Sequence, residues 1–81
     1  MTYVKADIAD IIERIPEKVV KYLEVCHDEM VFARNDDDEL FFQEFHHKMM
    51  GVLDCLTAQQ IITDADSSKL YRYYTDDFWE E

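Results

Sequence analysis

Hydrophobic side chains recur along the first half of the chain at the spacing of amphipathic α-helices. In residues 2–15 a valine and four isoleucines repeat every few positions, with acidic residues between them and Thr2 available as a cap. Pro16 ends this helix, because proline disrupts the preceding turn but fits the first turn of a new helix. The pattern predicts a second helix from Glu17 to about Ala33, with a buried face of Val19, Val20, Leu23, Cys26, His27 and Met30.

A short acidic segment separates the two halves of the chain. Asn35 to Asp38 forms the clearest loop, and its aspartates suit the start of a helix, where their oxygens cap free N–H groups and negative charge is favoured. A third helix is predicted from about Glu39 to Leu56, with Phe41 at the margin of its apolar stripe. Its apolar stripe contains Phe42, Phe45, Met49, Val52, Leu53 and Leu56.

Residues 61–74 have two interpretations, and a cap signal precedes them. Thr57 and Gln60 resemble a capping box. In one interpretation a short helix begins at Asp66 or Ser67 and turns an apolar face inward. In the other, residues 61–63 pair with residues 70–74 as a β-hairpin. We favour the helix, whose inward side chains are Leu70, Tyr71 and Tyr74.

The composition agrees with a helical fold. One glycine and one proline in 81 residues leave few sharp turns, and 48% hydrophobic residues suffice for one small core. We therefore expect residues 1–81 to form a single all-α domain. It is predicted to be a small bundle of three long amphipathic helices plus a short C-terminal helix, with residues 75–81 as a mobile acidic and aromatic tail.

The charge is strongly negative and unevenly placed. Nineteen acidic residues against eight basic ones give a net charge of −11. Residues 1–35 hold seven acids and five bases (net −2), whereas residues 36–81 hold twelve acids and three bases (net −9). Direct binding to nucleic acid or to an anionic membrane requires a basic patch, and the sequence has none. The expected partner is therefore a basic protein.

The N-terminal residues lack the basic segment and apolar run of a signal peptide, and no stretch approaches the roughly 18 apolar residues of a membrane helix. These features predict a cytoplasmic protein. Cys26 and Cys55 are too few for a disulfide framework and are expected to remain thiols.

Two Glu-x-x-His patterns are the sharpest metal-like feature. Glu24 with His27 and Glu44 with His47 have the spacing that carboxylate-bridged two-metal bundles use. However, His27 lies on the core side of its predicted helix, whereas His47 points away from the apolar stripe. We therefore expect a satisfied core His27 and solvated His46 and His47, with no metal and no cofactor.

Other chemical sites have weaker patterns. A zinc site from Cys26, His27, His46 and Cys55 has ligand types but no ligand spacing. No nucleophile signature is present, and a helical chain with one glycine has little loop from which to build a catalytic cleft. We expect both cysteines to be core or boundary residues and the protein not to be an enzyme.

The acidic residues themselves suggest a binding surface. Carboxylates three or four positions apart on a helix lie about 5–6 Å apart at Cβ, close to the spacing of phosphates along a nucleic-acid strand. One such row is Asp10, Glu13 and Glu17, and another is Glu24 with Asp28. The loop residues Asp36, Asp37 and Asp38 add a dense negative patch.

The C-terminal segment combines acids with aromatics. Its members in the predicted interface are Asp76, Asp77, Phe78, Trp79 and Glu80. Phe78 and Trp79 either fold back to cover the core or anchor a partner, since tryptophan is enriched in binding hot spots.

In size, acidity and lack of enzymatic motifs the chain resembles the small inhibitors that phages make against host nucleic-acid enzymes, including anti-CRISPR proteins and DNA mimics. The resemblance implies a viral protein of the host cytoplasm. The leading hypothesis is an acidic inhibitor or adaptor that docks on a basic, nucleic-acid-binding surface. The alternatives are a metal-binding helical module and a structural homo-oligomer, such as a homodimer that associates through the aromatic tail.

Overall fold

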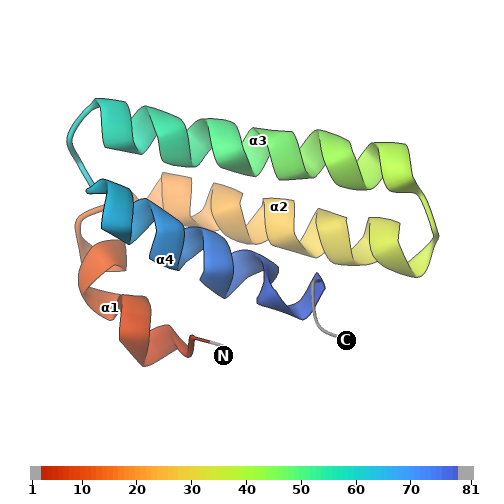
Figure 1. Ribbon diagram of the computed structural model, residues 1–81, viewed down its shortest axis with the longest axis horizontal. Helices are drawn as coiled ribbons and strands as arrows, with labels where there is room; N and C mark the ends of the chain where they lie inside the picture. Colours follow the sequence, from red (N-terminus) through yellow and green to blue (C-terminus); the bar gives the residue numbers. More distant parts are fainter. Residues whose placement is uncertain (1–2, 79–81) are drawn as a thin grey trace.

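The structure, a computed structural model, describes residues 3–78, with four α-helices and a terminal 3₁₀ turn (Figure 1). These residues contain no strand, so the β-hairpin interpretation is wrong and the all-α prediction is confirmed. The helices are α1 (Lys5–Glu13), α2 (Glu17–Asn35), α3 (Glu39–Ala58) and α4 (Asp64–Thr75), followed by η1 (Asp76–Phe78).

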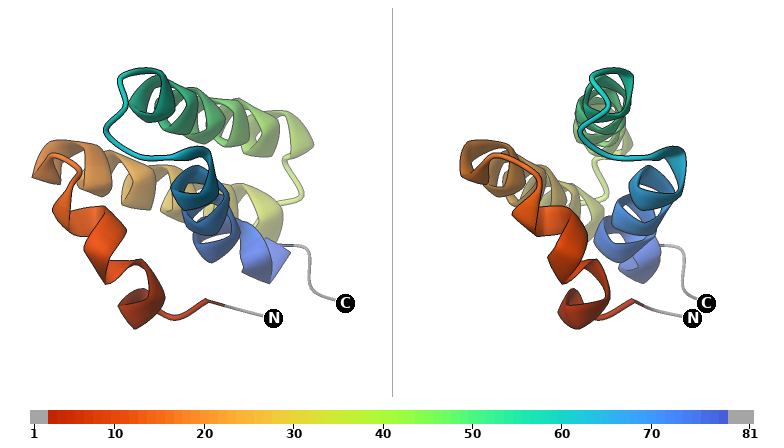
Figure 2. Two further views of the ribbon diagram at one scale, coloured as in Figure 1. Left: turned by 60° about the vertical axis from the view of Figure 1, so that its left-hand side comes forward. Right: turned by 90° about the vertical axis from the view of Figure 1, so that its left-hand side faces the viewer.

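An antiparallel hairpin of α2 and α3 forms the body of the domain. Helix α4 returns beneath this hairpin and packs against α1, α2 and α3. Helix α1 is short and lies against α4 at the end of the hairpin where α2 begins (Figure 2). The candidate site described below is lined by residues of α1, α2 and the end of α4.

The core lies where α2, α3 and α4 meet, and the predicted stripes supply most of it. Leu23, Cys26, Met30 and Met49 have no exposed surface, and Leu53 has 1%. Val19, Val20, Phe45 and Val52 are only partly buried at the edges of the core. The helical periodicity therefore identified the buried faces of α2 and α3 correctly, because each long helix has one face that no solvent reaches.

The first helix is shorter than predicted. Val4 precedes it as the N-cap and is exposed, and the Asp7 carboxylate accepts the Val4 backbone N–H at 2.8 Å. Ile15 lies beyond the end of the helix but is still buried. The bundle thus has two long helices of 19 and 20 residues and two short ones of nine and twelve, rather than three long helices.

The boundaries around α4 also differ from the prediction. Thr57 does not cap a helix, because it lies inside α3 and its hydroxyl donates to the Leu53 carbonyl at 2.9 Å. Gln60, with φ of 63°, adopts the left-handed conformation after α3. Helix α4 begins at Asp64, before the predicted Asp66 or Ser67, since Thr63 is its cap.

A capping box starts α4 and also ties it to α1. The Thr63 hydroxyl accepts the Asp66 N–H and the Asp66 carboxylate accepts the Thr63 N–H, both at 3.1 Å. Asp66 also forms a salt bridge with Arg14 at 3.0 Å, just after α1. The Thr63 N–H and Arg14 hold the pKa of Asp66 below its usual range.

Replacing Asp66 by alanine is expected to destabilise the fold by about 1–2 kcal/mol at neutral pH, because it removes the side-chain half of the capping box together with the salt bridge. Chemical denaturation of Asp66→Ala and Asp64→Ala tests this, since Asp64 is a charge in the same turn of α4. Because the pKa of Asp66 is lower in the folded state, the ionised carboxylate stabilises the fold at pH values above the pKa of an unfolded aspartate. This stabilisation is lost as the pH falls through the pKa of the folded state. The difference in unfolding free energy between the wild type and Asp66→Ala should therefore become smaller as the pH is lowered. If Asp64→Ala loses as much stability as Asp66→Ala, the capping box does not have the proposed role.

Candidate functional site

A groove of about 480 Å³ lies where α1, α2 and α4 meet. Its floor is apolar and aromatic, and carboxylates stand around its rim. We call it the acidic groove. It is lined by Tyr3, Lys5, Ile8, Ile12, Val20, Glu24, His27, Asp28, Tyr73, Tyr74 and Asp76.

Three carboxylates from two elements converge on the acidic groove. Glu24 and Asp28 are exposed and one turn apart on α2, whereas Asp76 follows α4. Lys5 is the one lysine or arginine among the lining residues. Among the described lining residues, three carboxylates therefore stand against one lysine, so the acidic groove is negatively charged and attracts cations.

Asp76 has an unpaired oxygen. Its Oδ2 atom is out of contact with solvent and has no hydrogen-bond partner among the residues that the structure describes. A buried acceptor without a donor costs free energy comparable to a lost hydrogen bond, and more when it is charged. A donor from outside, above all a cationic one, would remove that cost.

The aromatic wall of the acidic groove comes from the end of α4. The Tyr73 and Tyr74 rings meet edge to face, with centroids 5.0 Å apart. Burial raises the pKa of Tyr74 to about 12, and the nearby charge of Glu24 acts in the same direction. Tyr74 therefore keeps its neutral hydroxyl at physiological pH. Aromatic faces beside carboxylates suit a lysine or arginine side chain, which has an apolar stem and a charged end.

His27 connects the carboxylates to the aromatic side chains. Its Nδ1 lies 3.5 Å from Oδ1 of Asp28, and its ring centroid lies 5.5 Å from that of Phe78 and 6.4 Å from that of Tyr74. The side chain is 28% exposed, so His27 stands at the edge of the acidic groove rather than inside the core.

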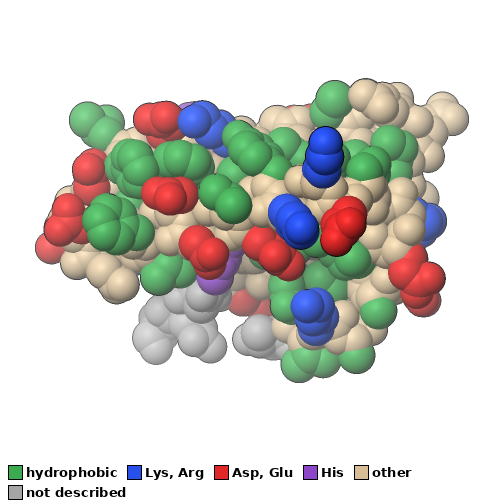
Figure 3. Space-filling view, turned by 180° about the vertical axis from the view of Figure 1, so that it is seen from behind, with side chains coloured by type: hydrophobic (Ala, Val, Ile, Leu, Met, Phe, Trp, Pro, Cys, Tyr) green, Lys and Arg blue, Asp and Glu red, His purple; other side chains and the backbone are tan. Residues whose placement is uncertain are grey.

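The predicted interface residues are dispersed over the surface. The acidic groove brings together Glu24, Asp28 and Asp76. Figure 3, a view of the α2 side from behind, shows other acidic side chains spread over this face, with several near the α2–α3 loop. The predicted interface is therefore larger than the acidic groove, which contains only three of its described acidic residues.

The row of Asp10, Glu13 and Glu17 does not lie on one helix. Helix α1 ends at Glu13, and Pro16 precedes Glu17 at the start of α2. The helical spacing assumed for this row is therefore interrupted. Glu17 instead lies 3.9 Å from Lys21 on its own helix.

The loop aspartates have a structural role. Asp38 caps α3, and its Oδ1 accepts the Phe41 N–H at 3.1 Å. Asp37 has a φ of 56°, a left-handed conformation that aspartate tolerates better than most residues. Asp36, Asp37 and Asp38 are all exposed, so their charges still contribute to the surface field.

The first residues of the predicted mobile tail are folded against the rest of the domain. Thr75 is fully buried, and its hydroxyl donates to the Tyr71 carbonyl at 2.7 Å. Phe78 is partly buried, with its ring 5.2 Å from Phe42, so it covers the core and is not a free anchor for a partner. Trp79, Glu80 and the side chain of Asp77 lie outside what the structure describes.

The histidines and cysteines are not gathered into a metal site. Among residues 3–78, no three His, Cys, Asp or Glu side chains are placed to hold one ion. Cys26 is buried and Cys55 is exposed. His46 is not solvated as predicted: it is part-buried and lies 2.8 Å from the Tyr71 hydroxyl. Burial, with a smaller effect from His47, lowers the pKa of His46.

Sequence reasoning missed two features. Tyr73 was not among the inward residues predicted for the last helix, although it lines the acidic groove with Asp76. Tyr22, Val25 and Phe32 were left unassigned, yet all three are exposed on α2. Their spacing of three and seven residues was a visible signal of a second apolar stripe on that helix.

No family model, no curated protein and no solved structure matches the chain. Within residues 3–78, none of the helices has the combination of length and apolarity needed to cross a membrane.

Proposed function

We propose that the protein is a small acidic inhibitor or adaptor that binds a basic segment of another protein in the acidic groove. One observation carries this proposal: three carboxylates lie around an aromatic surface, and one of them has a desolvated oxygen with no donor among the described residues. A lysine or arginine entering the acidic groove would donate to Asp76 and lie against Tyr73 and Tyr74.

The net charge of −11 supports the same partner class. A long-range negative field accelerates encounter with a basic protein and disfavours encounter with nucleic acid itself. Proteins that bind nucleic acids carry basic surfaces that contact the phosphates. The finer proposal is therefore that the partner is a nucleic-acid-binding protein and that the chain competes with DNA or RNA for it, as anti-CRISPR proteins of the DNA-mimic type do.

The acidic groove is tested with a peptide of alternating arginine and leucine residues, titrated into isotopically labelled protein and followed by NMR. We expect the largest shift changes at Glu24, Tyr73 and Asp76. The triple variant Glu24→Gln, Asp28→Asn, Asp76→Asn should lose at least about tenfold in affinity, since each charge-assisted hydrogen bond contributes about 1.5–3 kcal/mol.

A matched control separates this site from general acidity. The triple variant Asp10→Asn, Glu13→Gln, Asp37→Asn removes the same charge from exposed positions outside the acidic groove. It should lose no more than about twofold, through weaker steering alone. Equal losses in the two triple variants would show that the peptide binds to diffuse charge and would rule out the acidic groove.

The nature of the partner is tested by affinity capture from a cell lysate, in parallel with wild-type protein and with the two triple variants. The proposal expects a basic protein that the wild type and the control variant retain at low salt and that the groove variant does not. Duplex DNA or RNA added to the purified complex should displace the chain. An acidic partner, or one retained unchanged at high salt and in excess nucleic acid, would contradict the proposal.

A further inference from the structure

The α2–α3 hairpin has a second hydrophobic face on the side that α4 does not cover. Helix α2 contributes Lys18, Tyr22, Val25, Glu29 and Phe32, and helix α3 contributes Phe41, Phe45, Lys48, Val52 and Cys55. We call these ten residues the outer face. Both sets follow the same alternating spacing of four and three residues, which is the repeat of helices that pack side by side in bundles.

The outer face is adjacent to the core stripe on each helix. On α2 the buried residues Leu23, Cys26, Met30 and Ala33 follow the same spacing, one position after the outer-face residues. A helix with two adjacent stripes of this kind is suited to pack against neighbours on two sides. Among the described residues, other helices cover the core stripe of α2 but not its outer-face stripe.

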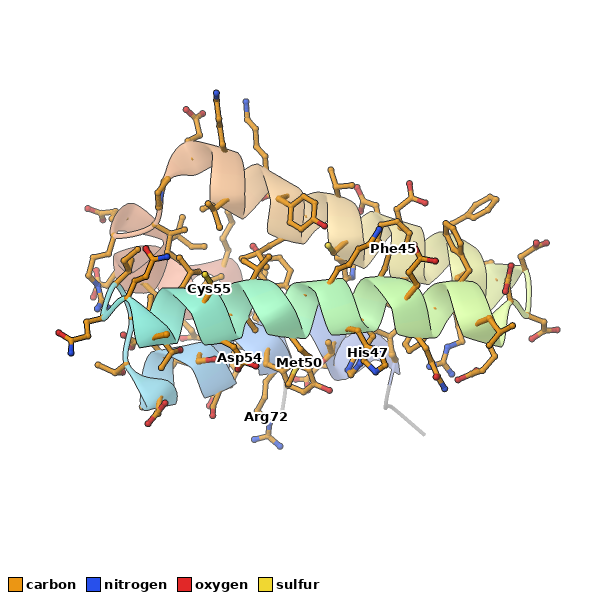
Figure 4. The ribbon with its side chains drawn as sticks, turned by 90° about the horizontal axis from the view of Figure 1, so that it is seen from above. Phe45, His47, Met50, Asp54, Cys55 and Arg72 are labelled. Atoms are coloured by element: carbon orange, nitrogen blue, oxygen red, sulfur yellow. The ribbon has the colours of Figure 1, made fainter. Side chains whose placement is uncertain are left out.

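Large apolar side chains are exposed on the outer face. Phe32 is 64% exposed, Val25 48% and Tyr22 40%. The Phe41 and Phe45 rings are in tilted contact, with centroids 4.9 Å apart and planes at 55°, and both are only partly buried. In Figure 4, Phe45 and Cys55 project from the edge of α3 that faces α2, whereas His47, Met50 and Asp54 lie on the opposite edge, toward Arg72.

The outer face is hollowed where α2 begins. A depression of about 350 Å³ lies there, and its lining is mainly apolar. Its lining includes Lys18, Tyr22, Val52 and Cys55. A side chain of the size of phenylalanine from a packing partner would fill part of this space.

The charge on the outer face reverses from one end to the other. Lys18, with Lys21 beside it, lies near the start of α2, whereas Glu29 and the loop residues Asp36 and Asp37 lie toward the other end. Figure 3 shows the same polarity, with basic side chains mainly over one half of this side and several acidic ones at the α2–α3 loop. A second copy turned end for end would place opposite charges together.

The outer face is also the least acidic part of α2 and α3. Its ten residues include two lysines and one glutamate, in a chain whose net charge is −11. Lys48 extends over the Phe45 ring at 4.5 Å and lies 3.2 Å from Glu44. The charge that would repel a second copy is concentrated elsewhere, and a basic partner has less reason to choose this face than the acidic groove.

We propose that the outer face is a homodimer interface in which two hairpins stack face to face as an antiparallel four-helix bundle. The two-fold axis passes near Val25, at the level of Lys48, whose positive charge is offset by Glu44 of its own chain at 3.2 Å. This places Lys21 of one copy near Glu29 of the second copy, and Lys18 near Phe32 of the second copy. An isologous contact of this kind is self-complementary by symmetry.

The dimer leaves the acidic groove open, because that groove uses a different face of α2, the one with Val20, Glu24 and His27. Dimerisation through the outer face does not require that a partner binds in the acidic groove. An interface two helices wide and about 28 Å long is at the small end of stable protein contacts, so association in the micromolar range is expected.

Sedimentation equilibrium from micromolar to millimolar concentration tests the proposal. The wild type should form a dimer. Val25→Glu should weaken association at least tenfold, because it places two carboxylates on the two-fold axis, while circular dichroism shows an intact helical fold. Leu40→Glu is the matched control, since Leu40 is 83% exposed on α3 but lies outside the outer face; it should leave association unchanged.

Cysteine crosslinking tests the antiparallel arrangement. In a Cys55→Ser background, Val25→Cys should form a disulfide-linked dimer on mild oxidation. Glu29→Cys alone should not, but a mixture of Lys21→Cys and Glu29→Cys chains should crosslink to each other. A wild type that remains monomeric at millimolar concentration would overturn the proposal, as would a dimer that Val25→Glu leaves intact.

Discussion

Replacing Leu53 by alanine is expected to lower the free energy of unfolding by about 2–5 kcal/mol, whereas Leu40→Ala should change it by less than about 0.5 kcal/mol. Both leucines lie on α3, but Leu53 is 1% exposed and Leu40 is 83% exposed. The first substitution leaves a cavity among tightly packed side chains. The second removes surface that water already reaches, and alanine is also a good helix former.

The effect of Leu53→Ala is large for a domain of 81 residues. Typical stabilities of about 0.05–0.15 kcal/mol per residue correspond to roughly 4–12 kcal/mol for a chain of this length. We therefore expect Leu53→Ala to lower the thermal midpoint by about 10 °C or more. Urea denaturation of both variants at low micromolar concentration provides the measurement. A substantial loss for Leu40→Ala would mean that Leu40 is covered by a contact that the single chain does not contain.

The stability of the fold should decline between about pH 10 and pH 12 because of Tyr74. Tyr74 is 5% exposed, and its burial raises the pKa to about 12, compared with about 10 for an unfolded tyrosine. Above pH 10 the unfolded chain releases this proton while the folded chain retains it. The stabilisation is therefore complete below pH 10 and is lost progressively as the pH rises to the folded pKa, by up to about 3 kcal/mol.

Tyr74→Phe should remove this part of the alkaline loss, because phenylalanine fills the same space without an ionisable group. Urea denaturation at several pH values between 8 and 12 measures the slope of stability against pH. Tyr22→Phe is the control, since Tyr22 is an exposed tyrosine on α2 and its replacement leaves Tyr74 in place. If Tyr74→Phe has the same alkaline slope as the wild type, Tyr74 is not protected from ionisation in the folded state.

The acidic groove and the outer face assign different partners to the two sides of α2. Glu24 and Asp28 line the acidic groove, where a cationic segment is expected, whereas Val25 and Phe32 are exposed on the outer face, where a second copy is proposed to bind. Val25→Glu should therefore weaken the dimer without weakening peptide binding. The groove triple variant should have the reverse effect, so the two proposals can fail independently.

The sequence alone was sufficient for the all-α class and for most of the buried faces of α2 and α3. The stripe that includes Leu23 and Met30 on α2 and the one that includes Met49 and Leu53 on α3 are indeed buried. Pro16 and the aspartates around Asp37 separate the helices, because proline and left-handed backbone interrupt helical hydrogen bonding within a few residues. These features depend on neighbours in the chain, which periodicity and turn chemistry describe well.

The tertiary structure alone decided which acidic residues belong together. The pairing of Arg14 with Asp66 and the position of Asp76 beside Glu24 and Asp28 depend on the path by which α4 returns to α1. Periodicity tells which side of a helix is buried but not which helix covers it. For the same reason, the sequence left Phe78 either as an anchor for a partner or as a cover for the core, and its packing on Phe42 places it on the core. The second stripe of α2 was present in the sequence, but only the fold showed that no other part of the described chain covers it.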